Sequence, residues 1–111
     1  MALIFHLTYK DAWEAARPAG EYAAPSLAEE GFIHCSKDIP QLLKVAGRLY
    51  PGETGLLVLD VELERLTSPL KNEPSRSGEI YPHIYGILNA DAVVRERVLE
   101  VDADGGHFVE G

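Results

Sequence analysis

"LLVLDVEL" (residues 56–63) decides the fold, because it is the strongest strand candidate in the chain. Leucine and valine occupy both alternating sets of positions, which is typical of a strand covered on both faces. The preceding residues 51–55 read PGETG, and their proline and glycines indicate a turn. We therefore predict that residues 56–63 form the central strand of a β-sheet.

Further strand candidates lie on either side of this stretch. Residues 67–78 are rich in Ser, Pro, Asn and Arg and are expected to form an ordered loop, with one short strand around Leu70–Asn72. Pro82 lies in a later extended segment and indicates an edge position or a bulge there, because proline has no N–H to donate. The other predicted strands are residues 3–8, 32–36, 79–86 and 92–101.

Short helices are predicted where a capping residue precedes a suitable first turn. The side chain of Ser, Thr or Asp accepts a hydrogen bond from an N–H of that turn, and a carboxylate or proline nearby strengthens the signal. The three candidate pairs are Thr8 with Asp11, Ser26 with Glu29, and Asp38 with Pro40. We expect two or three short helices, within residues 9–20, 26–31 and 38–50.

Length and pattern together predict one α+β domain with a mostly antiparallel sheet. A chain of 111 residues is long enough to bury about two thirds of the surface that its unfolded form exposes. Residues 1–111 form this single domain, with a core over about residues 3–101. Residues 102–111 are expected to be a frayed tail, in which His107 is solvated.

Composition narrows the range of functions. The formal net charge is −8 and the ten Lys and Arg residues are scattered, which argues against a large nucleic acid as partner. A single cysteine excludes an internal disulfide and fits a reducing compartment. No apolar run approaches the roughly 18 to 20 residues that cross a bilayer, and no secretory signal is evident. We expect a cytoplasmic protein without a membrane partner.

The segment GFIHCS (residues 31–36) carries three side chains of the kinds that catalyse reactions. Strand alternation places His34 and Ser36 on one face and Ile33 and Cys35 on the other. His34 and Cys35 therefore do not form a catalytic pair with each other, and Cys35 is interpreted as a small buried hydrophobe. A pair between Cys35 and a histidine of another strand stays open.

Three of the four histidines repeat one pattern: each lies in a short extended apolar or aromatic segment with a hydroxyl two residues later. This repetition favours a shared cleft for a small molecule. The residues concerned are His6 with Thr8, His34 with Ser36, and His83 with Tyr85, and Tyr81 lies on the same face as His83.

The acidic residues near these segments are less informative. Glu73 is the carboxylate of interest, in the loop before YPHIYG, whereas Glu29 and Glu30 are expected to be solvated. Three histidines are also consistent with a zinc-type site. However, no two of them are close enough in sequence to form a preorganised pair of ligands, and no carboxylate is an obvious partner to orient them. No glycine-rich phosphate loop is present.

Several motifs closely resemble a family of small bacterial proteins, domain-of-unknown-function family 952, over about Leu3–Val98. The motifs are IFHLT (4–8), DAWEAA (11–16), GFIHCS (31–36), YPHIYG (81–86) and DAV (91–93). That family is similar to the ADP-ribosyltransferase fold, and within it to the RNA 2′-phosphotransferases that consume NAD. The resemblance implies a split, curved β-sheet that holds NAD in a cleft.

The resemblance also implies roles for particular residues. His6 would be the first-strand residue of the cleft and His34 the second, with Ser36 beside it, while His83 or Tyr85 would stand near the third position. The chain lacks the Arg-His pair that precedes the second motif in the phosphotransferases, and it lacks a glutamate at the third. These departures put an RNA substrate and glutamate-dependent transfer to protein in doubt.

The expected function is therefore that of an enzyme of the transferase or glycohydrolase type acting on NAD or a related nucleotide. His6 and His34 would bind ribose and diphosphate, and Tyr81 or Tyr85 would stack on a ring of the ligand. NAD is expected as a substrate, with no certain cofactor and no bound metal. The alternatives are a non-catalytic sensor for a small anionic metabolite and, third, a three-histidine metalloprotein.

Overall fold

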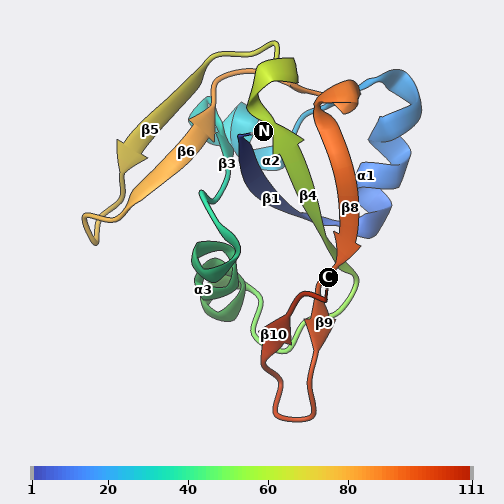
Figure 1. Cartoon of the computed structure of the whole chain (residues 1–111), viewed down its shortest axis with the longest axis vertical. Coiled ribbons are helices and arrows are strands. Elements are labelled where there is room, and N and C mark those ends of the chain that lie inside the picture. The colour runs from blue at the N-terminus through green and yellow to red at the C-terminus, as the bar shows by residue number, and fades with distance from the viewer. Residues whose placement is uncertain (1, 111) are drawn as a thin grey trace.

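The computed structural model describes residues 2–110, and its main sheet is built around the predicted central strand (Figure 1). Strand β4 (Leu56–Glu62) lies between β1 (Leu3–Tyr9) and β8 (Val93–Val98), and both neighbours are antiparallel to it. Every residue of β4 except the last is buried. The sequence prediction for this strand is confirmed, because a strand with two partners and two covered faces needs apolar side chains throughout.

A second three-stranded sheet has the order β3 (Ile33–His34), β6 (Ile80–Ile84) and β5 (Leu70–Pro74). Its central strand is β6, so the edge position predicted from Pro82 is wrong. The edge of Pro82 that carries its carbonyl, and that lacks an N–H donor, faces β3. The proline is tolerated because the chain turns away from β6 directly after this point, so the missing donor has no further strand to bond. The N–H of Cys35 still donates to the Pro82 carbonyl at 3.0 Å.

One short bridge joins the two sheets. After β3 the chain turns toward β1, where Phe5 and Ser36 donate to each other's carbonyls at 2.8 and 2.7 Å. The segment that carries His34 is thus fixed to β6 at one end and to β1 at the other.

The helices are α1 (Lys10–Ala16), α2 (Pro25–Glu30) and α3 (Ile39–Leu49). Only α3 begins with the predicted cap: Asp38 Oδ1 accepts from the N–H of Gln41 at 2.8 Å. The predicted boxes at Thr8 and Ser26 are wrong, since both hydroxyls have partners elsewhere in the fold. Thr8 bonds Tyr22 Oη at 2.6 Å, and Ser26 donates to the Phe32 carbonyl at 2.8 Å.

Smaller elements complete the chain. Strand β2 (Glu21–Tyr22) pairs with β7 (Leu88–Asn89), and β9 (Glu100–Val101) pairs with β10 (His107–Phe108). The 3-10 turns are Arg17–Ala19, Leu63–Arg65 and Ala90–Ala92.

The C-terminal segment differs from the frayed tail expected over residues 102–111. It turns back at residues 102–106 to form the β9–β10 hairpin, and Nε2 of His107 donates to the Tyr50 carbonyl at 2.7 Å. His107 is therefore half-buried rather than solvated, because β10 packs beside α3. Residue 111 lies outside the described residues.

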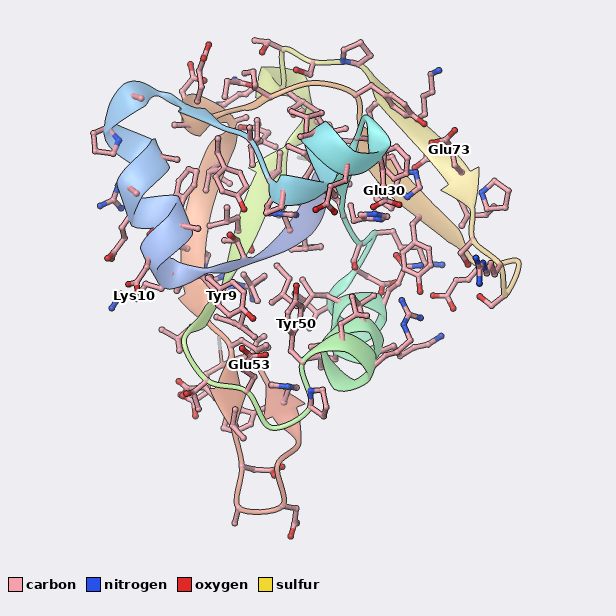
Figure 2. All side chains as sticks on the ribbon, turned by 180° about the vertical axis from the view of Figure 1, so that it is seen from behind. Tyr9, Lys10, Glu30, Tyr50, Glu53 and Glu73 are labelled. Carbon is pink, nitrogen blue, oxygen red and sulfur yellow. The ribbon has the colours of Figure 1, made fainter. Side chains whose placement is uncertain are left out.

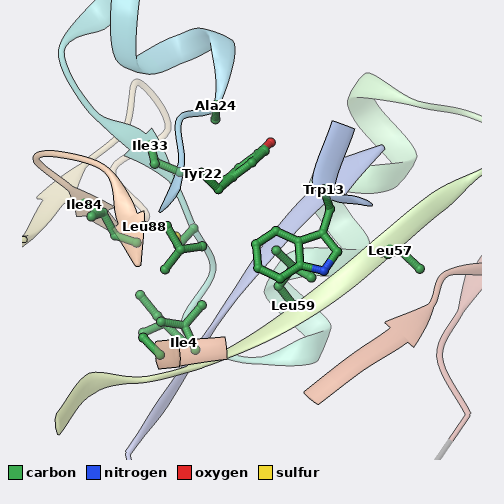
Figure 3. Close-up of a cluster of buried hydrophobic side chains, with 12 residues drawn as sticks. Ile4, Trp13, Tyr22, Ala24, Ile33, Leu57, Leu59, Ile84 and Leu88 are labelled. Atoms are coloured by element: carbon green, nitrogen blue, oxygen red, sulfur yellow. The ribbon is translucent and has the colours of Figure 1, made fainter. Parts of the chain in front are cut away.

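Two apolar clusters cover the two faces of β4. On one face Leu57, Leu59 and Val61 pack with Trp13 of α1 and with Ile84 of β6, as Figure 3 shows for several of these side chains. On the other face Leu56 and Val58 pack against α3. The further members of that second cluster are Leu42, Ala46 and Leu99. The sheet edge at β1 is therefore enclosed by α1, α3 and the second sheet, and this enclosure produces the cleft.

Candidate functional site

A cleft of about 560 Å³ runs along the edge of β1 that faces away from β4. Its size falls within the range of about 300 to 1,000 Å³ that is usual for small-molecule sites. Its walls come from β1, the α1–α2 region, β3, α3 and the turn between β5 and β6. Of the residues predicted from the sequence, six line it: His6, Thr8, His34, Ser36, Tyr81 and His83. Glu73 and Tyr85 do not line the cleft. Glu73 is hydrogen-bonded to His83, and the Tyr85 hydroxyl donates to Glu73.

His34 and His83 are directly opposite each other on the paired strands β3 and β6. Their ring centroids are 5.2 Å apart and the rings are nearly perpendicular. Phe32 stacks on His83 at a centroid distance of 4.1 Å, which fixes the plane of that imidazole. Strand alternation predicted correctly that His34 lies on the opposite face of the segment from Ile33 and Cys35, which are both buried in the core.

Each of these two histidines is held by a carboxylate. Nε2 of His34 lies 2.8 Å from Glu30 Oε2, and Nδ1 of His83 lies 2.8 Å from Glu73 Oε1. A carboxylate accepts, so each of these nitrogens carries the proton. Nδ1 of His34 and Nε2 of His83 have no hydrogen-bond partner within residues 2–110. Figure 2 labels Glu30 and Glu73 on α2 and β5.

The contact of Glu30 with His34 was not predicted from the sequence, where Glu30 was expected to be solvated. The signal available was the spacing of four residues between Glu30 and His34, which becomes a contact because α2 ends directly before β3. The pair is half-exposed, whereas His83 is buried and better shielded from water.

Glu73 is a charged acceptor with two donors. Hydrogen bonds from Tyr85 Oη and then from His83 lower the pKa of its carboxyl group, so it is ionised at neutral pH. The same contact raises the pKa of Tyr85, whose hydroxyl therefore stays protonated. The ammonium of Lys71 lies 4.6 Å from the centroid of the Tyr85 ring.

His6 lies deeper than the other two histidines and is only 5% exposed. Its Nδ1–H donates to the backbone carbonyl of His34 at 2.7 Å. Burial lowers its pKa to about 4, so the ring is neutral at pH 7. His6 therefore presents a neutral ring to the cleft. The hydrogen bond from His6 holds the backbone carbonyl of His34 in place.

Cys35 is buried in the first apolar cluster, and burial raises the pKa of its thiol. A thiol held protonated in this way is a poor nucleophile, so the catalytic Cys–His pair left open by the sequence is not supported. The three histidines likewise do not converge as metal ligands. Within residues 2–110 no group of three or more His, Cys, Asp or Glu side chains is arranged to hold a metal ion.

Two cationic residues of the cleft were not identified from the sequence. Arg48 lies near the end of α3 and Arg76 in the turn between β5 and β6, and both line the cleft. Neither stands in a recognisable motif, so their proximity to the histidines depends on the tertiary fold.

The fold and the cleft define a small α+β domain with a ligand-sized site at the junction of two antiparallel sheets. The model of a family described as "Protein of unknown function (DUF952)" matches residues 7–96, and the chain belongs to this family. The crystal structure of protein CC0527 from Caulobacter crescentus is similar, with 38% identity and a TM-score of 0.83, covering 96% of this chain and 93% of that one.

The solution NMR structure of CC0527 gives the same result. It is 36% identical, with a TM-score of 0.81, and covers 96% of this chain and 91% of that one. No curated protein matches the chain significantly. Within the described residues, no helix combines the length and apolar character required to cross a membrane.

Proposed function

We propose that the chain is an enzyme of the transferase or glycohydrolase type that acts on NAD or a related nucleotide in the cleft beside β1. The observation that carries this proposal is the pair of histidines at the cleft, each held by its own carboxylate and each with one ring nitrogen free. The resemblance of the motifs to the ADP-ribosyltransferase fold and to the RNA 2′-phosphotransferases supports the choice of NAD.

The histidine–carboxylate pairs are suited to proton transfer. A carboxylate on one nitrogen fixes the tautomer and the ring orientation and stabilises the imidazolium that forms when the other nitrogen takes a proton. His83 is the better-positioned base, because Glu73 holds its Nδ1 and Phe32 holds its ring plane. His34, half-exposed across the strand pair, donates to or accepts from the ligand with Nδ1.

The reaction would break the bond between C1′ of the ribose and the nicotinamide nitrogen. The bonding electron pair leaves with nicotinamide, and positive charge develops on the ribose as an oxocarbenium-like state. The oxygen of water or of an acceptor hydroxyl then bonds to C1′, and its proton passes to Nε2 of His83. Positioning and electrostatic stabilisation, rather than a protein nucleophile, supply the catalysis, which agrees with a buried, protonated Cys35.

Aromatic side chains give the cleft a surface for a planar ring. Phe32, Tyr22 and Tyr81 line it, and a nicotinamide or adenine ring would stack on one of them. Tyr85, the other residue expected to stack, does not line the cleft, and its ring contacts Lys71. We therefore favour Tyr81 over Tyr85 for this role.

The test is a titration of NAD, ADP-ribose and nicotinamide against wild type, with chromatographic assay of released nicotinamide. His83→Asn and Glu73→Gln should lower nicotinamide release by about a hundredfold, in the range by which a positioned general base accelerates a reaction. Their affinity for NAD should change less than threefold. His107→Asn is the matched control, because His107 lies outside the cleft, and it should behave as wild type.

Two results would contradict the proposal. NAD binding without turnover in the wild type, over a wide pH range and with small alcohols as acceptors, would make the chain a binding or sensor module. Turnover that persists in both His83→Asn and His34→Asn would remove the histidine pair from the chemistry.

A further inference from the structure

The cleft contains an excess of positive charge that the rest of the molecule does not show. The chain has six arginines, and four of them make interactions outside the cleft. Arg17 pairs with Glu96, Arg65 with Glu62 and Arg97 with Asp60, and Arg95 also has an interaction partner. The other two, Arg48 and Arg76, have neither an ion pair nor a hydrogen bond within residues 2–110, and both line the cleft.

These two arginines come from elements that are fastened to each other. Lys44 of α3 pairs with Glu79 beside the β5–β6 turn at 2.6 Å, and Gln41 of α3 donates to the Ile80 carbonyl at 2.9 Å. Arg48 follows Lys44 by four residues, so it lies on the same side of α3, toward the turn that carries Arg76. Figures 1 and 2 show α3 and this turn on the same side of the molecule.

The neighbouring carboxylates do not neutralise this pair. Glu79 is already bound by Lys44, whose contact lowers the pKa of the Glu79 carboxyl group to about 2. Glu30, the acidic residue among those lining the cleft, is bound to His34. In a protein of net charge −8, these two exposed guanidinium groups without a protein partner form a local positive region at the cleft that is open to an anionic ligand.

We propose that Arg48 and Arg76 bind a phosphoryl group of the ligand at the α3 end of the cleft. The planar guanidinium donates two parallel hydrogen bonds to phosphate oxygens, and two such groups match the charge of a phosphate monoester or a diphosphate. This inference rests on the proposed function, and it deepens it by naming the ligand class as phosphorylated nucleotides rather than nucleosides. It also moves the diphosphate from His6 and His34 to the arginines.

The assignment divides the cleft into two parts. Phosphate is held between α3 and the β5–β6 turn, and the sugar extends from there toward His34 and His83 on β3 and β6. The neutral His6 fits this division, because an uncharged imidazole gives a phosphate little electrostatic attraction.

The experiment measures the affinity of inorganic pyrophosphate, ADP and adenosine by calorimetry for wild type, Arg48→Gln and Arg76→Gln. Each substitution should weaken ADP and pyrophosphate binding by about tenfold or more, since hydrogen bonds to charged groups are strong, and should leave adenosine binding unchanged. Raising the salt concentration should weaken ADP binding in wild type and less so in the variants. Arg65→Gln is the matched control, because Arg65 pairs with Glu62 and does not line the cleft.

The outcomes separate this inference from the proposed function. Equal ADP affinity in wild type and both arginine variants would overturn the phosphate assignment, even if NAD is still cleaved. Weaker phosphate binding in the arginine variants of a protein that never cleaves NAD would support the assignment and overturn the enzyme. Failure of wild type to bind any phosphate compound would overturn both. Thermal melting of each variant confirms that it is folded.

Discussion

The buried, neutral His6 makes a quantitative prediction about stability at mildly acidic pH. Its pKa falls from 6.5 to about 4 on folding because burial disfavours the imidazolium. Between these two values the unfolded chain binds a proton at this position and the folded chain does not. The free energy of unfolding therefore decreases as the pH falls through this window.

The size of the effect follows from the shift. A difference of about 2.5 pKa units at about 1.4 kcal/mol per unit gives roughly 3.5 kcal/mol, most of which is lost by pH 4.5. An electrostatic interaction with His34 lowers the pKa of His6 further, by less than burial does. The carboxyl groups of Glu73 and Glu79 affect stability at lower pH. Their pKa values are lowered on folding, so the stability that they contribute is lost only as the pH falls below their ordinary value of 4.5.

The assay is urea unfolding between pH 7 and pH 4.5 for wild type, His6→Asn and His107→Asn. The amide of His6→Asn can still donate to the His34 carbonyl but does not titrate. We expect it to be less stable than wild type at pH 7 and to lose about 2 to 3 kcal/mol less on acidification. His107→Asn should keep the wild-type pH dependence. If His6→Asn and wild type lose the same stability between pH 7 and pH 4.5, the argument that His6 is buried in its neutral form is refuted.

Two further predictions concern the core. Cys35→Ala should cost about 1 kcal/mol of stability through lost packing and should leave NAD binding unchanged, whereas rapid reaction of wild type with a thiol reagent at neutral pH would contradict the buried thiol. Asp60→Asn should cost about 3 to 5 kcal/mol, because it leaves the guanidinium of Arg97 without its 2.8 Å ion-pair partner inside the protein. Denaturant unfolding measures it, and a loss below about 1 kcal/mol would show that water reaches Arg97.

The sequence predicted those features that depend on local periodicity. The apolar character of residues 56–63 identified the central strand, and alternation in residues 31–36 separated the core face of Ile33 and Cys35 from the cleft face of His34. Each of these predictions needs only the geometry of an extended chain. The cap at Asp38 is also a local feature, because its hydrogen-bond partner is only three residues away.

Predictions failed where the partner is distant along the chain. The hydroxyls of Thr8 and Ser26 fit a capping pattern, but tertiary contacts with Tyr22 and Phe32 replace it. The edge position expected from Pro82 was wrong. Pro82 lacks the N–H that would bond to β3, but β3 ends beside it, so a central strand can hold this proline.

The candidate site shows the same difference between features that depend on local sequence and features that depend on distant contacts. Its histidines were found because each has a hydroxyl two residues later, a pattern that is visible in one segment at a time. Arg48 and Arg76 were missed because only the packing of α3 on the β5–β6 turn brings them to the cleft. The neutral state of His6 also depends on burial by distant segments, which its own short segment does not reveal.

The bridge between Phe5 and Ser36 has a consequence for the lifetime of the site. Two backbone hydrogen bonds fasten the segment that carries His34 to β1, and the ring of His6 adds a third at the His34 carbonyl. A fluctuation that opens this bridge separates the His34 segment from β1 and from His6, while β3 stays paired with β6. The protection of the Phe5 and Ser36 amides against hydrogen exchange therefore reports the fraction of time during which the histidine pair is held against β1.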